Sequence, residues 1–162
     1  MVLIGSSFGG WAVARFAELH PSRVHALVLL NPGFNLGERW EEIVPGGRAS
    51  LAAWQRDGKR RFHMPATGEP VDMPWSFVRE TRAQVGMPTS VAAPCCVLHG
   101  TRDDVVPHAL SEAFVERQRE RRVPSRLILL DDDHALTAPA SLERIARESA
   151  KWCVIGAAPP GA

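Results

Sequence analysis

A strand, a serine turn and a helix follow one another at the start of the chain. The apolar run Val2–Ile4 leads directly into Gly5-Ser6-Ser7-Phe8-Gly9, which fits the pattern G-x-S-x-G with Ser7 at its centre. Helix formers with an apolar stripe continue to Leu19, and Val24–Leu30 is then a short, almost wholly apolar run. A strand, a helix and a second buried strand in this order predict parallel strands in a sheet covered by helices.

The serine turn indicates nucleophilic chemistry. A serine hydroxyl is a weak nucleophile, and a sharp turn between strand and helix holds it exposed to a base. We expect Gly5 and Gly9 to be glycines because a side chain would collide where the strand and the helix cross. An ordinary turn serine is the alternative interpretation of Ser7. A phosphate-binding loop is excluded, since the turn has neither G-x-G-x-x-G nor a Gly-Lys-Ser/Thr ending.

A carboxylate loop follows a later apolar run. The strand candidate Cys95–Leu98 leads into a loop that carries Asp103 and Asp104, and a helix is predicted to open at Pro107. A carboxylate in such a loop can orient an imidazole. The loop therefore supplies a candidate for the acid of a hydrolytic triad.

A histidine follows the next strand candidate. Arg126–Leu130 leads into Asp131-Asp132-Asp133-His134. The carboxyl ends of parallel strands lie at one edge of a sheet, so we expect His134 to lie there together with Ser7 and Asp103. The chain order Ser, Asp, His is the order that α/β-hydrolases use.

Three segments together resemble the α/β-hydrolase superfamily, and most of all its short bacterial esterase-like members. They are Val2–Phe34, Pro94–Ala113 and Arg126–Thr137, about half of the chain. The resemblance implies an α/β fold with about four parallel strands flanked by helices and a small lid insertion. It implies that Ser7 is the nucleophile and His134 the general base. Asp103 would be the acid that holds the histidine, with Asp104 as the alternative.

The activity implied by this resemblance is hydrolysis of a carboxylic ester or thioester bond in a small-molecule substrate, without a cofactor or metal. The backbone N–H of Phe8, just after the nucleophile, would bind the oxyanion. Peptidase chemistry is the rival within the enzyme class. Haloalkane dehalogenases resemble the fold but have aspartate where this chain has Ser7.

Other groups of polar residues have simpler interpretations than a metal site. Asp131–Asp133 could suggest a cation site, but no glycine-punctuated ligand loop accompanies them, so a solvated acidic loop is favoured. His99, Asp103 and His108 could be metal ligands, but His99 belongs to a His-Gly turn that recurs in the resembled family. We therefore predict no metal. The cysteines are predicted to be buried, reduced thiols, namely Cys95, Cys96 and Cys153.

Composition excludes several classes of partner. A net charge of +1 gives no attraction to nucleic acid or to acidic membranes. The sequence contains no apolar run of about 18 residues and no signal-peptide pattern, so we predict a cytoplasmic protein with no membrane association. One domain is expected over residues 1–155, and the tail at 156–162, rich in small residues and proline, is predicted to be disordered.

The segment at about 36–90 is expected to form the lid insertion. Short helices are predicted at Glu38–Val44, Ala49–Arg56 and Ser76–Gln84, and a hairpin is predicted from Arg61–Met64 and Val71–Trp75. Aromatic side chains gather in this segment, and they form either an apolar acyl pocket or simply the core of a small lid. The candidates for the pocket are Trp40, Trp54, Phe62, Trp75 and Phe77.

The resemblance begins only at the strand before the nucleophile. Members of the family carry several strands before it, and a loop among them donates the second oxyanion N–H. We therefore expect an N-terminally truncated chain whose apolar strand Val2–Ile4 is an exposed edge open to self-association. The alternative function is a catalytically impaired or inactive hydrolase fragment that acts as an interaction or oligomerising module.

Overall fold

The computed structural model describes residues 1–63 and 67–157, and it divides into two compact units. The first unit comprises residues 1–34 and 87–162, and the second comprises residues 35–86. Of the tail predicted to be disordered, residues 158–162 lie outside the described part, while Gly156 and Ala157 end the last helix. Within the described part, no helix combines the length and the apolar character needed to cross a bilayer.

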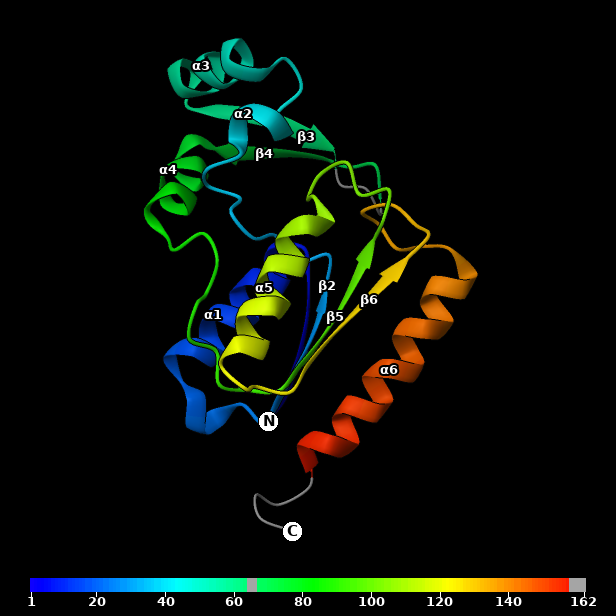
Figure 1. The fold of residues 1–162 in the computed structure, drawn as a ribbon. Helices are drawn as coiled ribbons and strands as arrows, with labels where there is room; N and C mark the ends of the chain where they lie inside the picture. Colours follow the sequence, from blue (N-terminus) through cyan, green and yellow to red (C-terminus); the bar gives the residue numbers. More distant parts are fainter. Residues whose placement is uncertain (64–66, 158–162) are drawn as a thin grey trace. The chain divides into compact units, whose positions relative to one another are not determined.

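The first unit is built on a four-stranded parallel sheet in the order β1-β2-β5-β6 (Figure 1). Its strands are β1 (Val2–Ser6), β2 (Ala26–Leu30), β5 (Cys95–Gly100) and β6 (Ser125–Leu130). Every residue of β5 is buried, and β2 is almost as fully covered. Strands buried on both faces need continuous apolar runs, which is how these segments could be recognised in the sequence. The prediction of an α/β fold with about four parallel strands is confirmed.

Helices cover both faces of this sheet. Helices α1 (Phe8–Leu19) and α5 (His108–Glu120) lie on one face, and α6 (Pro139–Ala157) lies on the other (Figure 1). A short 3₁₀ turn, Pro21–Arg23, joins α1 to the approach to β2. Successive strand residues point to opposite faces. Two separate apolar cores result, one containing Leu27, Leu29, Cys95 and Val97, the other containing Val28, Cys96 and Leu98.

Strand β1 forms one border of the sheet and pairs with β2 alone among the described strands. Its Ile4 side chain is 49% exposed, and Met1 before it is 48% exposed. An apolar strand at a sheet border is the arrangement expected for Val2–Ile4 from the sequence. Whether the chain associates through it stays a prediction.

The second unit contains two short helices, a hairpin and a third helix. These are α2 (Trp40–Ile43), α3 (Gly47–Asp57), the antiparallel pair β3 (Lys59–His63) and β4 (Pro70–Pro74), and α4 (Trp75–Ala83). The predicted second hairpin strand ended at Trp75, but this residue begins α4. Met64, the predicted end of the first hairpin strand, lies outside the described residues.

The cysteines do not all share one environment. Cys95 and Cys96 are buried on β5, and burial raises the pKa of the two thiols to about 11 and about 12. Cys153 on α6 is exposed, so the prediction that it is buried was wrong. Cys153 lies on the solvent-facing side of α6. The sequence pattern predicts a helix here but does not show which of its sides packs against the sheet.

Candidate active site

Ser7 occupies a strained turn between β1 and α1. Its φ is 52°, a left-handed conformation that residues other than glycine seldom adopt. Backbone hydrogen bonds hold it there: the Ser7 N–H donates to the Leu30 carbonyl at 2.9 Å, and its own carbonyl accepts from Gly10 at 2.9 Å and Gly33 at 2.7 Å. Strain of this kind persists only where the surrounding structure fixes it, and it is frequent at functional sites.

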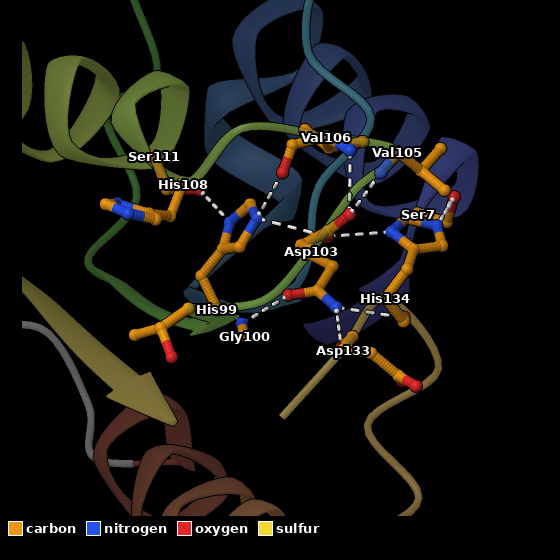
Figure 2. Close-up of polar contacts among 12 residues, drawn as sticks. Ser7, His99, Gly100, Asp103, Val105, Val106, His108, Ser111, Asp133 and His134 are labelled. Carbon is orange, nitrogen blue, oxygen red and sulfur yellow. Dashed lines mark hydrogen bonds and ion pairs between the residues drawn. The ribbon is translucent and has the colours of Figure 1, made fainter. Parts of the chain in front are cut away.

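The Ser7 side chain is the first member of a hydrogen-bonded relay, Ser7–His134–Asp103 (Figure 2). Ser7 Oγ lies 2.9 Å from His134 Nε2, and His134 Nδ1 lies 2.7 Å from Asp103 Oδ2. An ionised carboxylate only accepts hydrogen bonds, so His134 Nδ1 carries the proton. The lone pair on His134 Nε2 therefore faces the serine hydroxyl, which donates to it.

Asp103 is held at both carboxylate oxygens. Its side chain is fully buried, and Oδ1 accepts from the N–H groups of Val105 at 2.9 Å and Val106 at 2.7 Å. Burial by itself would raise the pKa of Asp103, but hydrogen bonds from His134, His99 and the Val106 amide outweigh it and hold the pKa well below its usual range. The carboxylate is thus ionised. Asp104, the alternative acid, lies on the exposed side of the loop.

The relay has the arrangement needed for proton transfer from a nucleophile. An imidazole within hydrogen-bond reach can take the serine proton as Oγ attacks, and the carboxylate fixes the tautomer and stabilises the imidazolium that forms. Three loops at the carboxyl ends of β1, β5 and β6 bring the members together. Their position at one edge of the sheet follows from the parallel pairing of the strands.

The glycines around Ser7 differ in their need to be glycine. A Cβ at Gly5 would lie 2.4 Å from the carbonyl oxygen of Gly9, so Gly5 permits the close crossing of β1 and α1. A Cβ at Gly9 itself would meet no atom within 4 Å, so the expectation that Gly9 avoids a collision was wrong. Gly10 has that role instead, because its Cβ would lie 2.9 Å from Pro32.

Gly33 packs directly on the peptide that joins Ser7 to Phe8. A Cβ at Gly33 would lie 3.1 Å from the Phe8 nitrogen and 3.2 Å from the Ser7 carbonyl group. We expect Gly33→Ala to displace this peptide by a few tenths of an ångström and to lower kcat roughly tenfold to a hundredfold, since nucleophile placement is sensitive to small shifts. Ester hydrolysis by the purified variant measures this. Gly9→Ala is the matched control and should retain wild-type kcat; equal losses in both variants would contradict the argument.

Asn31 is a site residue that the sequence analysis did not identify. It follows β2, is fully buried and has a left-handed φ of 41°. Its Oδ1 accepts from the Gly100 N–H at 2.8 Å, while Nδ2 donates to the carbonyls of Asp133 at 3.1 Å and His134 at 2.9 Å. One side chain thus ties the end of β2 to the end of β5 and to the loop that carries His134.

Removal of these three hydrogen bonds should destabilise the protein. We expect Asn31→Ala to lower the free energy of unfolding by about 2–3 kcal/mol, because the buried Gly100 N–H loses its acceptor. Urea denaturation followed by circular dichroism measures the change. Asn35→Ala is the control for the backbone, since Asn35 is also left-handed, with φ 58°. A loss in Asn35→Ala as large as in Asn31→Ala would show that the backbone, not the side-chain bonds, determines the cost.

Phe8 opens helix α1 directly after Ser7. Its ring stacks on that of Trp11, with centroids 5.1 Å apart. The amide of Phe8 stands at the N-terminus of the helix, where the partial positive charge of the macrodipole is concentrated. Its role as an oxyanion donor stays a prediction.

The five aromatic residues proposed for a pocket pack on one another in the second unit. Trp40 and Trp54 are buried at its centre, with ring centroids 5.6 Å apart, and Phe62, Trp75 and Phe77 surround them. The two buried indole N–H groups are satisfied, by Thr81 Oγ1 at 2.8 Å and the Met73 carbonyl at 3.0 Å. The rings thus form the core of this unit, the second of the two interpretations. A role in a substrate pocket stays a prediction.

The acidic loop before His134 is only partly a solvated loop. Asp131 is exposed and pairs with Arg102. Asp132 is buried, and its carboxylate accepts from the N–H groups of Asp133 at 2.9 Å and Ala138 at 3.0 Å. A hydrogen bond from Ser141 is the main cause that lowers the pKa of Asp132. The expectation of a solvated loop was therefore wrong for Asp132, whose function is to hold the start of α6.

No cluster of three or more His, Cys, Asp or Glu side chains suited to a metal ion occurs among residues 1–63 and 67–157. Of the three residues considered as ligands, His99 and Asp103 contact each other. Both are also hydrogen-bonded to the backbone of Val106.

Comparison with known proteins assigns the chain to a family. The model of the alpha/beta hydrolase fold family matches residues 1–155. The chain belongs to the alpha/beta hydrolase fold family. Among curated proteins it is similar to the mitochondrial palmitoyl-protein thioesterase ABHD10 of the mouse, with 28% identity over 144 residues, and to that of the rat, with 25% identity over 123 residues. These matches cover 82% and 72% of this chain, but only 42% and 39% of the relatives.

Solved structures show the same fold. A monoacylglycerol lipase from Paleococcus ferrophilus superposes with a TM-score of 0.71 at 17% identity, over 96% of this chain and 68% of the lipase. Mouse alpha/beta hydrolase domain-containing protein 10 superposes with a TM-score of 0.66 at 23% identity, over 93% of this chain and 60% of that protein. At these identities the likeness concerns the fold.

Proposed function

We propose that the protein is a serine hydrolase that cleaves a carboxylic ester or thioester bond in a small-molecule substrate. Ser7 is the nucleophile, His134 the general base and Asp103 the acid that orients it. One observation carries the proposal: His134 Nε2 lies 2.9 Å from Ser7 Oγ, while His134 Nδ1 lies 2.7 Å from a buried carboxylate. Membership of a hydrolase family supports it.

The proposed reaction has two halves. Ser7 Oγ attacks the carbonyl carbon as His134 Nε2 takes its proton, and the Phe8 N–H stabilises the resulting oxyanion. His134 then gives the proton to the leaving alcohol or thiol, and an acyl-enzyme remains. Water attacks the acyl-enzyme, its proton passes to His134, and collapse returns the proton to Ser7 and releases the carboxylic acid.

The substrate class follows from the relatives and from the chemistry. The two curated relatives are palmitoyl-protein thioesterases, which supports the thioester as one substrate class. The relay itself suits esters and thioesters alike, because in both the serine attacks a carbonyl carbon and His134 can protonate the leaving alcohol or thiol. The curated relatives are mitochondrial by name. The cytoplasmic location expected from the sequence stays a prediction.

Covalent labelling tests the proposed function together with turnover. We expect a fluorophosphonate to phosphonylate the chain at Ser7, located by peptide mass spectrometry, and the unlabelled chain to hydrolyse p-nitrophenyl butyrate and the corresponding thioester. The chain spans about two fifths of the length of its curated relatives. Labelling therefore tests the nucleophile even where turnover is slow.

The outcomes separate the two candidate functions. Labelling at a residue other than Ser7 would contradict the assignment. Neither labelling nor turnover from a folded chain would favour the alternative, an inactive module that associates through β1. The specific observation behind that alternative is the half-exposed Ile4 on a border strand. Sedimentation of the same sample would then reveal oligomers.

A further inference from the structure

A second histidine lies against the relay without belonging to it. His99 is fully buried near the end of β5 (Figure 2). Its Nδ1 lies 2.7 Å from Ser111 Oγ on α5, and its Nε2 lies 2.9 Å from the Val106 carbonyl oxygen and 3.2 Å from Asp103 Oδ2. Because both ring nitrogens of this buried imidazole have hydrogen-bond partners, the orientation of the ring is fixed.

The partners of His99 determine where its proton resides. The two groups near Nε2 are a carbonyl oxygen and a carboxylate oxygen, and neither can donate a hydrogen bond. Nε2 must therefore carry the proton and donate. The partner of Nδ1 is a serine hydroxyl, which can donate to the free lone pair on that nitrogen. Ser111 thus suits the tautomer that places an N–H between Val106 and Asp103.

This N–H acts on Asp103 from two sides. Its nitrogen lies 3.2 Å from Oδ2, the oxygen that accepts from His134, close enough for the polar N–H to attract that oxygen electrostatically. It also binds the Val106 carbonyl, and the N–H of Val106 donates to the other carboxylate oxygen, Oδ1, at 2.7 Å. His99 therefore restrains both the carboxylate and the loop segment that holds it.

We propose that His99, which carries its proton on Nε2 and is held at Nδ1 by Ser111, is a positioning residue that fixes Asp103 for its contact with His134. The proposal rests on the function proposed above for the relay. Hydrogen bonding from His99 is among the causes that lower the pKa of Asp103, in agreement with an N–H directed at the carboxylate. A second consequence is electronic. Because Oδ2 of Asp103 interacts with His99 as well, the hydrogen bond that Oδ2 accepts from the His134 N–H is weakened.

Two substitutions of equal length separate this role from simple packing. Glutamine at position 99 places an amide N–H near the position of Nε2, whereas methionine fills similar space without a donor. We expect His99→Met to lower kcat tenfold to a hundredfold with little change in KM, and His99→Gln to restore most of the loss. Equal kcat values in the two variants would overturn the proposal, because packing alone would not distinguish them.

A spectroscopic measurement gives a readout that does not need turnover. The His134 Nδ1 proton bound to Asp103 is observable far downfield in the proton NMR spectrum. In His99→Met this resonance should move further downfield, because Oδ2 then serves His134 alone, or disappear if Asp103 leaves its place. In His99→Gln it should stay near the wild-type position. The same position in all three proteins would overturn the proposal.

The unsubstituted protein provides a test that does not depend on any variant folding. Nitrogen-15 shifts of the His99 ring in this protein should show a proton on Nε2 and none on Nδ1. A ring without a proton on Nε2 would overturn the proposal. Failure of the proposed function gives a different result: no Ser7 labelling or turnover, with the His99 tautomer and the response of the downfield proton unaffected.

Discussion

Ser7→Ala should abolish ester hydrolysis, and His134→Ala should do the same. Each substitution removes one end of the 2.9 Å hydrogen bond through which the proton must pass. Loss of a triad nucleophile or base costs on the order of 10⁶-fold in kcat, so both variants should fall to the background rate. Hydrolysis of p-nitrophenyl butyrate by the purified proteins, with folding checked by circular dichroism, measures the effect.

The double variant sharpens this test. Members of one relay act as a unit, so Ser7→Ala combined with His134→Ala should be no slower than either single variant. Additive losses would mean that the two residues act independently. Retention of most activity in either single variant would contradict the assignment of the nucleophile or of the base.

Asp103→Asn should lower kcat by about 10⁴-fold, the second largest effect we expect. The asparagine keeps the shape of the side chain but can present its N–H₂ to His134, which favours the wrong tautomer and removes the charge that stabilises the imidazolium. The neighbouring substitution Asp104→Asn is the matched control. It removes the same charge one residue away, on the exposed side of the loop.

The ratio of the two rates decides which aspartate is the acid. We expect Asp104→Asn to remain within about twofold of wild type, since an exposed charge is screened by water. A larger loss in Asp104→Asn than in Asp103→Asn would show that the relay geometry differs in solution. Steady-state kinetics at pH 7 provide both values.

The sheet could be predicted from the sequence because its physical basis is local. A parallel strand buried on both faces needs a continuous apolar run, which Val24–Leu30 and Cys95–Leu98 supply. The border strand in Arg126–Leu130 is apolar at most positions too, although only Ile128 is buried. The loops that follow these strands carry polar side chains that can take part in catalysis, such as Asp103 and His134. Because parallel strands end at one edge, the sequence also predicts that Ser7, Asp103 and His134 lie together.

Other features of the site depend on contacts that no local pattern records. Asn31 follows an apolar run like any turn residue, and only the three-dimensional arrangement shows its hydrogen bonds to the ends of two further strands. His99 is part of a familiar His-Gly pair, but its contact with Asp103 depends on how the loop folds back. The glycine of the G-x-S-x-G pattern at position 9 faces open space, because α1 crosses β1 closest at Gly5.

The separation of the relay along the chain has a consequence for how the protein reaches its native state. Ser7 and His134 are 127 residues apart, and every strand pairing of the large sheet is parallel, so each requires a crossover connection. Such non-local contacts form slowly. Ser7 follows one border strand of the sheet and His134 follows the other, so the nucleophile meets its base only when all four strands are paired. Reactivity at Ser7 is therefore a reporter of the completed native topology.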